Sequence, residues 1–241
     1  MKVPAVILCG GLGTRLRGLL GDRPKCLAPM GNSTYLDVFT DYLYRQGVEN
    51  FIFATGYGHA HVEAWLQEGR RPWRYLLSRE QEPLGTGGAL RLAAQHVETK
   101  QLLAFNGDTF LEVDCRKLLA RHLAGGCPVT LTAVEVADTA EFGRLEIVEG
   151  YVVKFLEKGQ SGAGMINGGS YVIERSFVAS WPAGSLSFEK QILMQPGFRA
   201  ASFISSGRFL DIGTPESLST SKKFLKELVE SKTRRTIIYE E

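Results

Sequence analysis

The sequence contains few cysteines, four in 241 residues, and none of them belongs to a C-x-x-C pair or has a histidine at zinc-finger spacing. We therefore expect reduced thiols at Cys9, Cys26, Cys115 and Cys127 and no structural metal. A chain of this length does not depend on such cross-links, because one large α/β domain, or two modest ones, can bury a sizeable hydrophobic core.

Long hydrophobic runs are also missing, and no segment approaches the ~20 apolar residues that span a bilayer. The apolar run at residues 3–9 is short and includes Pro4, and the large Leu8 precedes Cys9, which argues against a signal peptide or a lipoprotein anchor. We interpret this run as a buried strand and expect a cytoplasmic protein that does not bind a membrane.

Neither sign of charge dominates, since 28 Lys and Arg residues are balanced by 26 Asp and Glu residues, for a net charge of +2. This balance excludes sequence-independent binding to nucleic acid, so any basic site must be local. With 44% hydrophobic and 22% charged residues, the composition is that of a globular protein and not of a disordered or collagen-like chain.

Apolar runs of strand length alternate with segments of helical period, which is typical of crossover βαβ units and a mostly parallel sheet. The helix predicted at residues 35–46 has apolar side chains at i, i+3, i+4 and i+7, and Gly47 follows it at the position of a C-cap. In the first half we also predict strands at residues 5–9, 51–55, 73–77 and 102–106 and helices at residues 84–96 and 114–123.

The middle of the chain changes character. A β-rich run at residues 129–136 precedes segments 144–148 and 151–156, which flank the turn Glu149-Gly150 and predict an antiparallel hairpin inserted into the α/β core. We then expect a strand at 165–173, a helix at 187–194, a strand at 200–205 and a closing helix at 215–230. The predicted organisation is one domain over residues 1–230 and a charged tail over residues 231–241, in which Ile237, Ile238 and Tyr239 could dock on the partner of a homodimer.

A glycine-rich turn, Gly10-Gly11-Leu12-Gly13-Thr14-Arg15-Leu16, directly follows the first predicted strand. Glycines let backbone N–H groups approach phosphate oxygens at the strand edge, where open α/β sheets bind ligands. The dinucleotide fingerprint G-x-G-x-x-G would need glycine in place of Leu16, and a Walker A loop would need Gly-Lys-Ser/Thr, so neither pattern fits. Arg15 and Lys25 are two cations that could converge on one polyphosphate; the alternative is a structural turn with solvated basic residues.

Segments from about residue 3 to residue 226 resemble the nucleoside-diphosphate-sugar pyrophosphorylases, which join a nucleoside triphosphate to a sugar 1-phosphate. The resemblance begins with G-G-x-G-T-R-L and R-P-K, although Cys26-Leu27 follows Lys25 where Pro and Met are expected. The further matches most resemble the D-glycero-D-manno-heptose 1-phosphate guanylyltransferases; they are E-P-L-G-T-G-G-A from Glu82, F-N-G-D-T-F from Phe105, I-N-G-G from Ile166, S-F-E-K from Ser187 and F-L-D-I-G-T-P-E from Phe209.

The resemblance implies a three-layer, Rossmann-like nucleotidyltransferase fold, Mg²⁺, and the substrates GTP and a sugar 1-phosphate, with a GDP-sugar made for capsule or other surface polysaccharide. Because the attacking sugar phosphate is already ionised near neutral pH, catalysis needs positioning and charge neutralisation and no general base. We expect Arg15 to chelate the β and γ phosphates through its planar fork and Lys25 to neutralise charge near the α-phosphate.

Two aspartates are predicted to bind the metal. Asp108 follows the strand predicted at residues 102–106, and Asp211 follows the apolar residues Phe209 and Leu210. Carboxylates that meet phosphates suit Mg²⁺, which prefers oxygen ligands and keeps several waters. Asp108 is therefore predicted to be both catalytic and a metal ligand; the alternative for either aspartate alone is a turn or N-cap residue.

The remaining site residues follow from the resemblance. Glu82 is expected to accept hydrogen bonds from guanine N1 and N2, and Lys158 to supply a second cation for the sugar phosphate. The predicted nucleotide-binding set is Leu8, Gly10, Gly11, Gly13, Thr14, Arg15, Glu82, Gly85, Thr86 and Gly87. The predicted sugar-phosphate set is Asn106, Gly107, Glu157, Lys158, Asn167, Gly168 and Glu189. For several of these residues the alternative is a helix cap or a solvated surface position.

Spacing alone distinguishes neither guanine from uracil or cytosine nor heptose from mannose. The alternatives are a uridylyl- or cytidylyltransferase acting on a hexose 1-phosphate, a catalytically silent nucleotide-sugar sensor, and a Rossmann oxidoreductase. Leu16 disfavours the oxidoreductase, and a sensor would not need Arg15, Lys25, Asp108 and Asp211 together.

Overall fold

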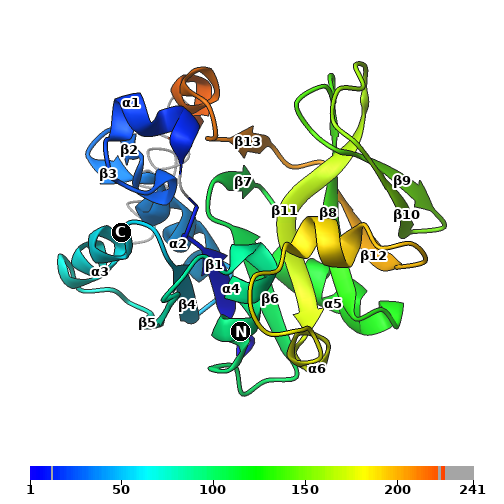
Figure 1. Ribbon diagram of the computed structural model, residues 1–241, viewed down its shortest axis with the longest axis horizontal. Helices are drawn as coiled ribbons and strands as arrows, with labels where there is room; N and C mark the ends of the chain where they lie inside the picture. Colours follow the sequence, from blue (N-terminus) through cyan, green and yellow to red (C-terminus); the bar gives the residue numbers. More distant parts are fainter. Residues whose placement is uncertain (12, 222–223, 226–241) are drawn as a thin grey trace, which may run out of the picture.

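A nine-stranded mixed sheet forms the centre of the molecule, in the order β5-β4-β1-β6-β11-β8-β12-β10-β9 (Figure 1). The computed structural model describes residues 1–11, 13–221 and 224–225. The strands of the sheet are β1 (Ala5–Leu8), β4 (Asn50–Thr55), β5 (Arg74–Arg79), β6 (Gln101–Asn106), β8 (Val129–Val136), β9 (Arg144–Val148), β10 (Tyr151–Leu156), β11 (Gly164–Glu174) and β12 (Ala200–Ser205).

The first half of the sheet is parallel, as predicted. β1 lies between β4 and β6, with Ala5 in register with Phe51 on one side and Leu103 on the other, and β5 adds the outer strand. Helical crossovers connect these strands, which is what parallel pairing requires. Their carboxyl ends therefore meet at one edge of the sheet.

The prediction of a mostly parallel sheet is wrong for the second half. β11 pairs antiparallel with both β6 and β8, and β10 pairs antiparallel with β12 and β9, while β12 and β8 are parallel. The cause is the predicted hairpin β9–β10, because the chain returns from it into β11 without a crossover helix. A bridge between Ile166 and Arg144 joins β11 to β9, so this half of the sheet curls back on itself.

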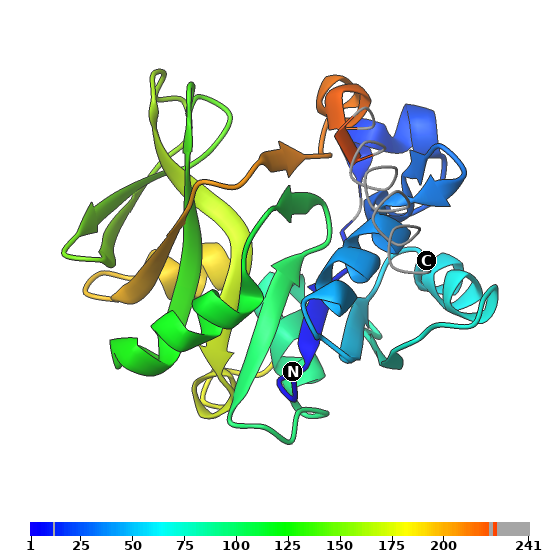
Figure 2. The same cartoon turned by 180° about the vertical axis from the view of Figure 1, so that it is seen from behind.

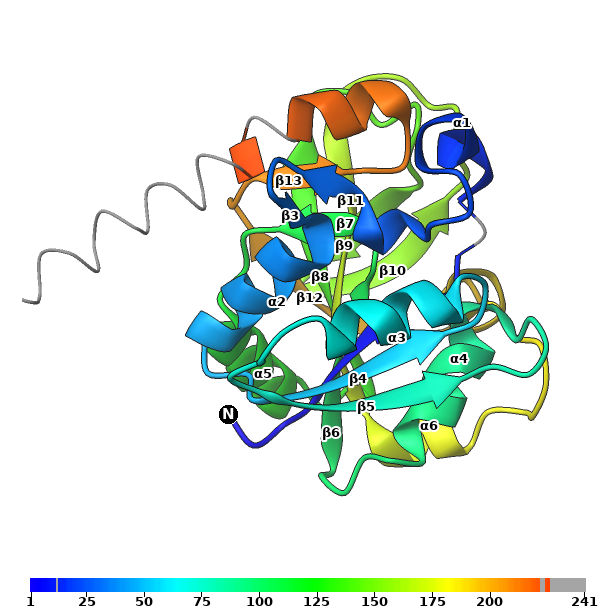
Figure 3. The ribbon, with the colours of Figure 1, turned by 90° about the vertical axis from the view of Figure 1, so that its left-hand side faces the viewer.

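Helices cover both faces of the sheet and enclose two hydrophobic cores. Along β1 the side chains alternate, with Ala5 and Ile7 in one core and Val6 in the other. The first core contains residues of α2 (Tyr35–Arg45), α3 (His59–Gln67) and α5 (Cys115–Gly125), and Figure 2 shows α2 and α5 on that face. The second core contains residues of α4 (Gly85–Ala94) and α6 (Arg175–Ala179), and Figure 3 shows the layers edge-on.

Local signals explain the elements that were predicted well. Thr34 and Asp37 form a capping box that begins α2, with the Asp37 N–H donating to Thr34 Oγ1 at 3.2 Å. Asp114 caps α5 by accepting from the Arg116 and Lys117 N–H groups. The helix predicted at residues 187–194 is a single π-helical turn, η3 (Glu189–Leu193). Residues 215–221 and 224–225 of the predicted closing helix are helical, and the rest of it and the tail lie outside the described residues.

Several short elements were not predicted. Around the glycine-rich turn these are η1 (Thr14–Leu16), α1 (Arg17–Leu20), η2 (Lys25–Leu27) and the hairpin β2 (Pro29–Met30) and β3 (Ser33–Thr34). A separate antiparallel pair joins β7 (Thr109–Leu111) to β13 (Phe209–Asp211). Among the described residues, no helix has the length and apolar character needed to cross a membrane.

Candidate functional site

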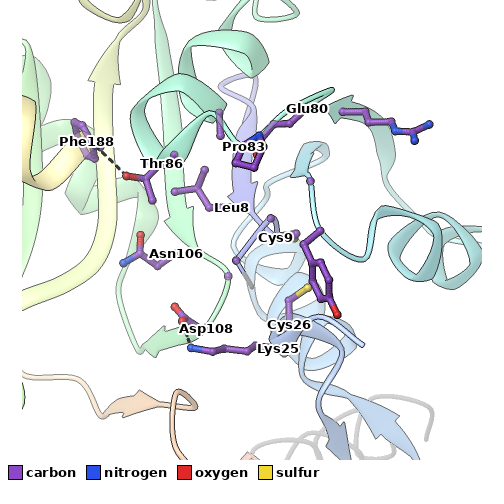
Figure 4. A pocket seen from close by; sticks show the side chains of 18 of the residues that line it. Leu8, Cys9, Lys25, Cys26, Glu80, Pro83, Thr86, Asn106, Asp108 and Phe188 are labelled. Carbon is purple, nitrogen blue, oxygen red and sulfur yellow. Dashed lines mark hydrogen bonds and ion pairs between the residues drawn. The ribbon is translucent and has the colours of Figure 1, made fainter. Parts of the chain in front are cut away.

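A cavity of about 670 Å³ opens at the carboxyl ends of β1, β4, β5 and β6 (Figure 4). This edge is where ligands bind in open α/β sheets. Residues predicted from the sequence make up about half of its wall; they are Leu8, Gly10, Gly11, Lys25, Glu82, Gly85, Thr86, Asn106, Gly107, Asp108 and Glu189. Residues that the sequence analysis missed include Gly56, Tyr57, Arg79, Glu80, Gln81, Tyr171 and Phe188.

Glycine is sterically required at the floor of the cavity. A Cβ atom on Gly107 would collide with the Leu8 carbonyl group, and one on Gly10 would lie 2.8 Å from Glu80 Oε1 and 3.1 Å from the Gly56 nitrogen. The loops after β1, β4 and β6 can therefore approach one another only without side chains at these positions. This close packing leaves the backbone at the bottom of the cavity open to a ligand.

A lysine and an aspartate form an ion pair in the cavity wall. Lys25 Nζ lies 3.2 Å from Asp108 Oδ2, and the side chains are 15% and 40% exposed. Figure 4 shows Lys25 reaching from η2 toward Asp108, which follows β6. Gly13, with a φ of +58°, packs against the aliphatic part of Lys25, where an added Cβ would lie 3.1 Å from Cγ. The glycine-rich turn therefore shapes the position of this ammonium group.

The pairing of β13 with β7 brings the second aspartate to the same region. Asp211 is in register with Thr109, and the Ile212 N–H donates to the Asp108 carbonyl at 3.0 Å. Desolvation, together with the negative charge of Asp108, raises the pKa of the Asp211 carboxyl, although a hydrogen bond from the Gly213 N–H opposes the shift. Arg15 is exposed and its guanidinium lies beside Gly213, so it belongs to this side of the site and not to the cavity wall.

This carboxylate pair suits a divalent cation. The two side chains repel each other when both are ionised, and a cation between them would remove that repulsion. They supply oxygen donors, and two carboxylates with waters and substrate phosphates form a usual Mg²⁺ environment. No group of three or more His, Cys, Asp or Glu side chains with metal-binding geometry occurs in the described part of the chain. The remaining ligands would therefore have to come from water and substrate.

At the start of α4, two polar groups already make hydrogen bonds within the protein. The Gly87 N–H donates to the Leu186 carbonyl at 2.8 Å, so this buried group is already used within the protein and does not line the cavity. Thr86 Oγ1 accepts from the Phe188 N–H at 2.9 Å (Figure 4), which ties the loop before η3 to α4. Gly85 and Thr86 remain at the cavity surface.

Glu80 is the carboxylate that the sequence analysis missed. It follows β5, its Oε2 accepts from the Leu84 N–H at 2.8 Å, and burial raises the pKa of its carboxyl. Glu82, which was predicted to contact the base, also lines the cavity but is exposed. Polar residues directly after a strand were the available signal, because the carboxyl end of β5 points to the same sheet edge as the glycine-rich turn.

On the opposite side of the cavity, side chains from β11 and η3 form a hydrogen-bonded group. Asn167 Nδ2 donates to the Tyr171 hydroxyl at 2.7 Å and to Glu189 Oε1 at 3.3 Å. Desolvation raises the pKa of the Glu189 carboxyl, the positive charge of Lys158 opposes that shift, and the charge of Asp108 reinforces it. Lys158 therefore lies close enough to act on this group.

Glu157 and Gly168 also lie away from the cavity wall. Glu157 is exposed beyond the end of β10. Gly168 is buried in β11, where a Cβ would lie 2.6 Å from Leu111 Cδ2, so its role in the structure is to allow packing. Thr14 begins η1 in the glycine-rich turn.

Comparisons with known proteins agree with this geometry. The family model described as nucleotidyl transferase matches residues 4–227. The chain is 34% identical to the D-glycero-alpha-D-manno-heptose 1-phosphate guanylyltransferase of Aneurinibacillus thermoaerophilus, over 93% of this chain and 99% of that protein, and 32% identical to the enzyme of the same name from Campylobacter jejuni, over 88% and 95%. The crystal structure of HddC from Yersinia pseudotuberculosis, also solved in complex with GMP-PN, superposes with a TM-score of 0.83 at 31% identity, covering 92% of this chain and 98% of that one.

Proposed function

The chain belongs to the nucleotidyl transferase family, and we propose that it is a guanylyltransferase that condenses GTP with a sugar 1-phosphate to give a GDP-sugar and pyrophosphate. D-glycero-D-manno-heptose 1-phosphate is the proposed acceptor, since two similar proteins carry that name over nearly their full length. The observation that carries the proposal is the cavity itself, in which a glycine-rich floor and the Lys25–Asp108 pair lie between a wall suited to a base and a wall suited to a sugar.

The triphosphate is proposed to lie along the glycine-rich turn. Lys25 holds its ammonium group over the floor of the cavity, where it can neutralise the α-phosphate as a compact charge. Arg15, beside Gly213, is placed to pair with the leaving β and γ phosphates when they extend out of the cavity. These cations lower the energy of a transition state in which negative charge builds on the departing pyrophosphate.

We propose that guanine contacts Glu80 in preference to Glu82. A carboxylate accepts both N1–H and N2–H of guanine, and it discriminates best when it is fixed and partly withdrawn from water. Glu80 meets both conditions through the Leu84 N–H and its burial against Gly10 and Gly56, whereas Glu82 is exposed. Gly85 and Thr86 complete that wall.

Asp108 and Asp211 are the proposed ligands of Mg²⁺. When bound, the cation would neutralise charge on the phosphates and fix their geometry. On the acceptor side, we propose that Asn106, Asn167 and Glu189 bind sugar hydroxyls and that Lys158 pairs with the sugar phosphate. The hydrogen bond from Asn167 to Glu189 and the effect of the Lys158 charge on the Glu189 carboxyl support this proposal. The sugar phosphate then attacks the α-phosphorus in line without a general base.

The test is product analysis by ion-exchange chromatography and mass spectrometry. The protein is incubated with Mg²⁺, each of GTP, ATP, CTP, UTP and dTTP, and either heptose 1-phosphate, mannose 1-phosphate or glucose 1-phosphate. GDP-heptose with equimolar pyrophosphate, lost in Asp108→Ala, is the expected result. If the product is a UDP- or CDP-hexose, the proposed substrates are wrong and the proposed mechanism stands. If the protein binds nucleotide but forms no product, it is a nucleotide-sugar sensor and not an enzyme.

A matched pair of variants tests the base contact. Glu80→Gln places an amide where the carboxylate stands, so it should raise the KM for GTP strongly and narrow the preference for GTP over ATP. Glu82→Gln makes the same chemical change on an exposed neighbour and should leave both unchanged. A larger effect in Glu82→Gln than in Glu80→Gln would restore the assignment made from the sequence.

Other expectations from the sequence remain predictions. They are one domain over residues 1–230, a homodimer, a cytoplasmic location, and a role in capsule or other surface polysaccharide synthesis. Size-exclusion chromatography with light scattering tests the dimer directly.

A further inference from the structure

Tyr171 lines the cavity in the middle of β11, and no role was predicted for it. It is 1% exposed, and its ring packs edge-on against Phe188 with 5.1 Å between ring centroids. Its place in the apolar run Tyr171-Val172-Ile173 of β11 is typical of a core residue. Its hydroxyl, however, is not in an apolar environment.

Two amide side chains from different strands act on the hydroxyl of Tyr171. Asn167 Nδ2, on β11, donates to it at 2.7 Å, and the amide of Asn106, at the end of β6, lies close enough to lower its pKa. Asn106 lies in the cavity wall beside Gly107 and Asp108, and Figure 4 shows its side chain close to the cavity. The buried hydroxyl of Tyr171 therefore lies between the end of β6, which leads into Asp108, and Asn167 on β11.

The connection continues to a carboxylate. The Oδ1 atom of Asn167 accepts from the Gly169 N–H at 3.1 Å, which determines which end of the amide is oxygen. Nδ2 must then divide its two protons between Tyr171 and Glu189 Oε1, which is 3.3 Å away. Because Oε1 of Glu189 is held in this way, Oε2 is left to accept from a ligand.

We propose that Tyr171 is a positioning residue for the sugar 1-phosphate: its hydroxyl anchors the amides of Asn106 and Asn167, and through Asn167 the carboxylate of Glu189, so that these groups select the hydroxyl pattern of the acceptor. The inference rests on the proposed function. A polar site that is held rigid rejects an acceptor with a misplaced hydroxyl because its own groups are then left unpaired, whereas a loose one adapts.

Burial keeps Tyr171 a neutral hydroxyl, since withdrawal from water raises its pKa far above the ordinary tyrosine value. Phenylalanine in its place would retain the ring and its contact with Phe188 and would remove only the anchor. Tyr171→Phe should therefore raise the KM for heptose 1-phosphate by about 10-fold to 100-fold, the usual cost of losing a group that orients a ligand. The KM for GTP should stay unchanged, and the preference for heptose 1-phosphate over mannose 1-phosphate should narrow.

The matched control is Tyr42→Phe. Tyr42 also donates a hydrogen bond from a partly buried hydroxyl, to the Val113 carbonyl at 3.1 Å, but it lies on α2 outside the cavity. This variant should keep the wild-type KM for both substrates. Equal changes in both variants, or a Tyr171→Phe protein in which both KM values rise together, would assign Tyr171 a structural role and overturn the inference.

A double-mutant cycle separates positioning from packing. If Tyr171 acts in part through Asn167, then Tyr171→Phe should raise the KM for heptose 1-phosphate by a smaller factor in the Asn167→Ala background than in the wild type, because only its effect on Asn106 then remains to be lost. Additive effects of the two changes would contradict the inference. Should Tyr171→Phe not fold, the same question is put to Asn106→Ala and Asn167→Ala, which should be coupled if both amides share one anchor and additive if they do not.

Failure of the underlying function has a different readout. A wild-type protein that releases no pyrophosphate from GTP with any sugar 1-phosphate overturns both the proposed function and this inference. A wild-type protein that makes the GDP-sugar, together with a Tyr171→Phe variant of unchanged KM and acceptor preference, overturns the inference alone.

Discussion

Removal of the Lys25 charge should separate catalysis from folding. Lys25→Met keeps an unbranched apolar chain that can pack on Gly13 as the lysine does, and it removes the ammonium 3.2 Å from Asp108 Oδ2. The Asp108 side chain is 40% exposed, so water solvates its carboxylate after the change. An ion pair of this exposure contributes about 0–1 kcal/mol to stability. For a protein of this size, that corresponds to a loss of at most about 2–4 °C in Tm.

The expected effect on turnover is much larger. If Lys25 neutralises the α-phosphate in the transition state, its loss removes a preorganised charge worth about 2.7–4 kcal/mol, which lowers kcat about 10²-fold to 10³-fold. The assay is pyrophosphate release at saturating GTP and heptose 1-phosphate, with Tm measured on the same preparations. Lys154→Met is the control, because the Lys154 ammonium lies 4.0 Å from Glu146 on an exposed surface and should affect neither quantity.

Two outcomes would refute this reasoning. In the first, the Lys25→Met protein folds and its kcat stays within about threefold of the wild-type value, which corresponds to less than about 1 kcal/mol of activation free energy. This result would show that the charge of Lys25 is not used in the transition state. A fall in Tm well beyond that of Lys154→Met shows instead that Lys25 is chiefly structural.

Three further predictions follow from burial and packing. Desolvation and the charge of Asp108 raise the pKa of Asp211, so ionisation of Asp211 opposes folding at every pH above the unfolded-state pKa. Asp211→Asn should therefore raise Tm at pH 7.5, raise it by a smaller amount at pH 4.5, and lower Mg²⁺-dependent activity. A lower Tm of the variant at pH 7.5 would contradict this sign. Gly107→Ala must push the Leu8 carbonyl away from its position in the cavity floor, so both activity and Tm should fall. The control is Gly126→Ala at the end of a helix, where there is open space but the φ is +63°, and this variant should lower Tm alone. Iodoacetamide should alkylate Cys127 before the other cysteines because Cys127 is the least buried of the four thiols, and peptide mapping by mass spectrometry would show the order. Earlier modification of Cys9, Cys26 or Cys115 would contradict this prediction.

Local patterns in the sequence were sufficient for the elements whose signals lie within a few residues. The helical period of residues 35–46 and Gly47 after it predicted α2, and the alternation of apolar runs predicted the parallel half of the sheet. The glycine-rich turn after β1 and the strand that ends before Asp108 likewise predicted which sheet edge holds the cavity, because parallel strands must present their carboxyl ends together.

Tertiary structure decided what depends on contacts between distant segments. Asp211 joins Asp108 only because β13 pairs with β7, and a three-residue strand carries too weak a local signal to predict that pairing. Glu80, in contrast to the exposed Glu82, is partly buried because the Leu84 N–H and the glycine loops close around it. The antiparallel half of the sheet and the anchoring position of Tyr171 arise from the same cause: strand order and side-chain partners are set by the burial of the whole chain, whereas local sequence sets only the propensity of each segment.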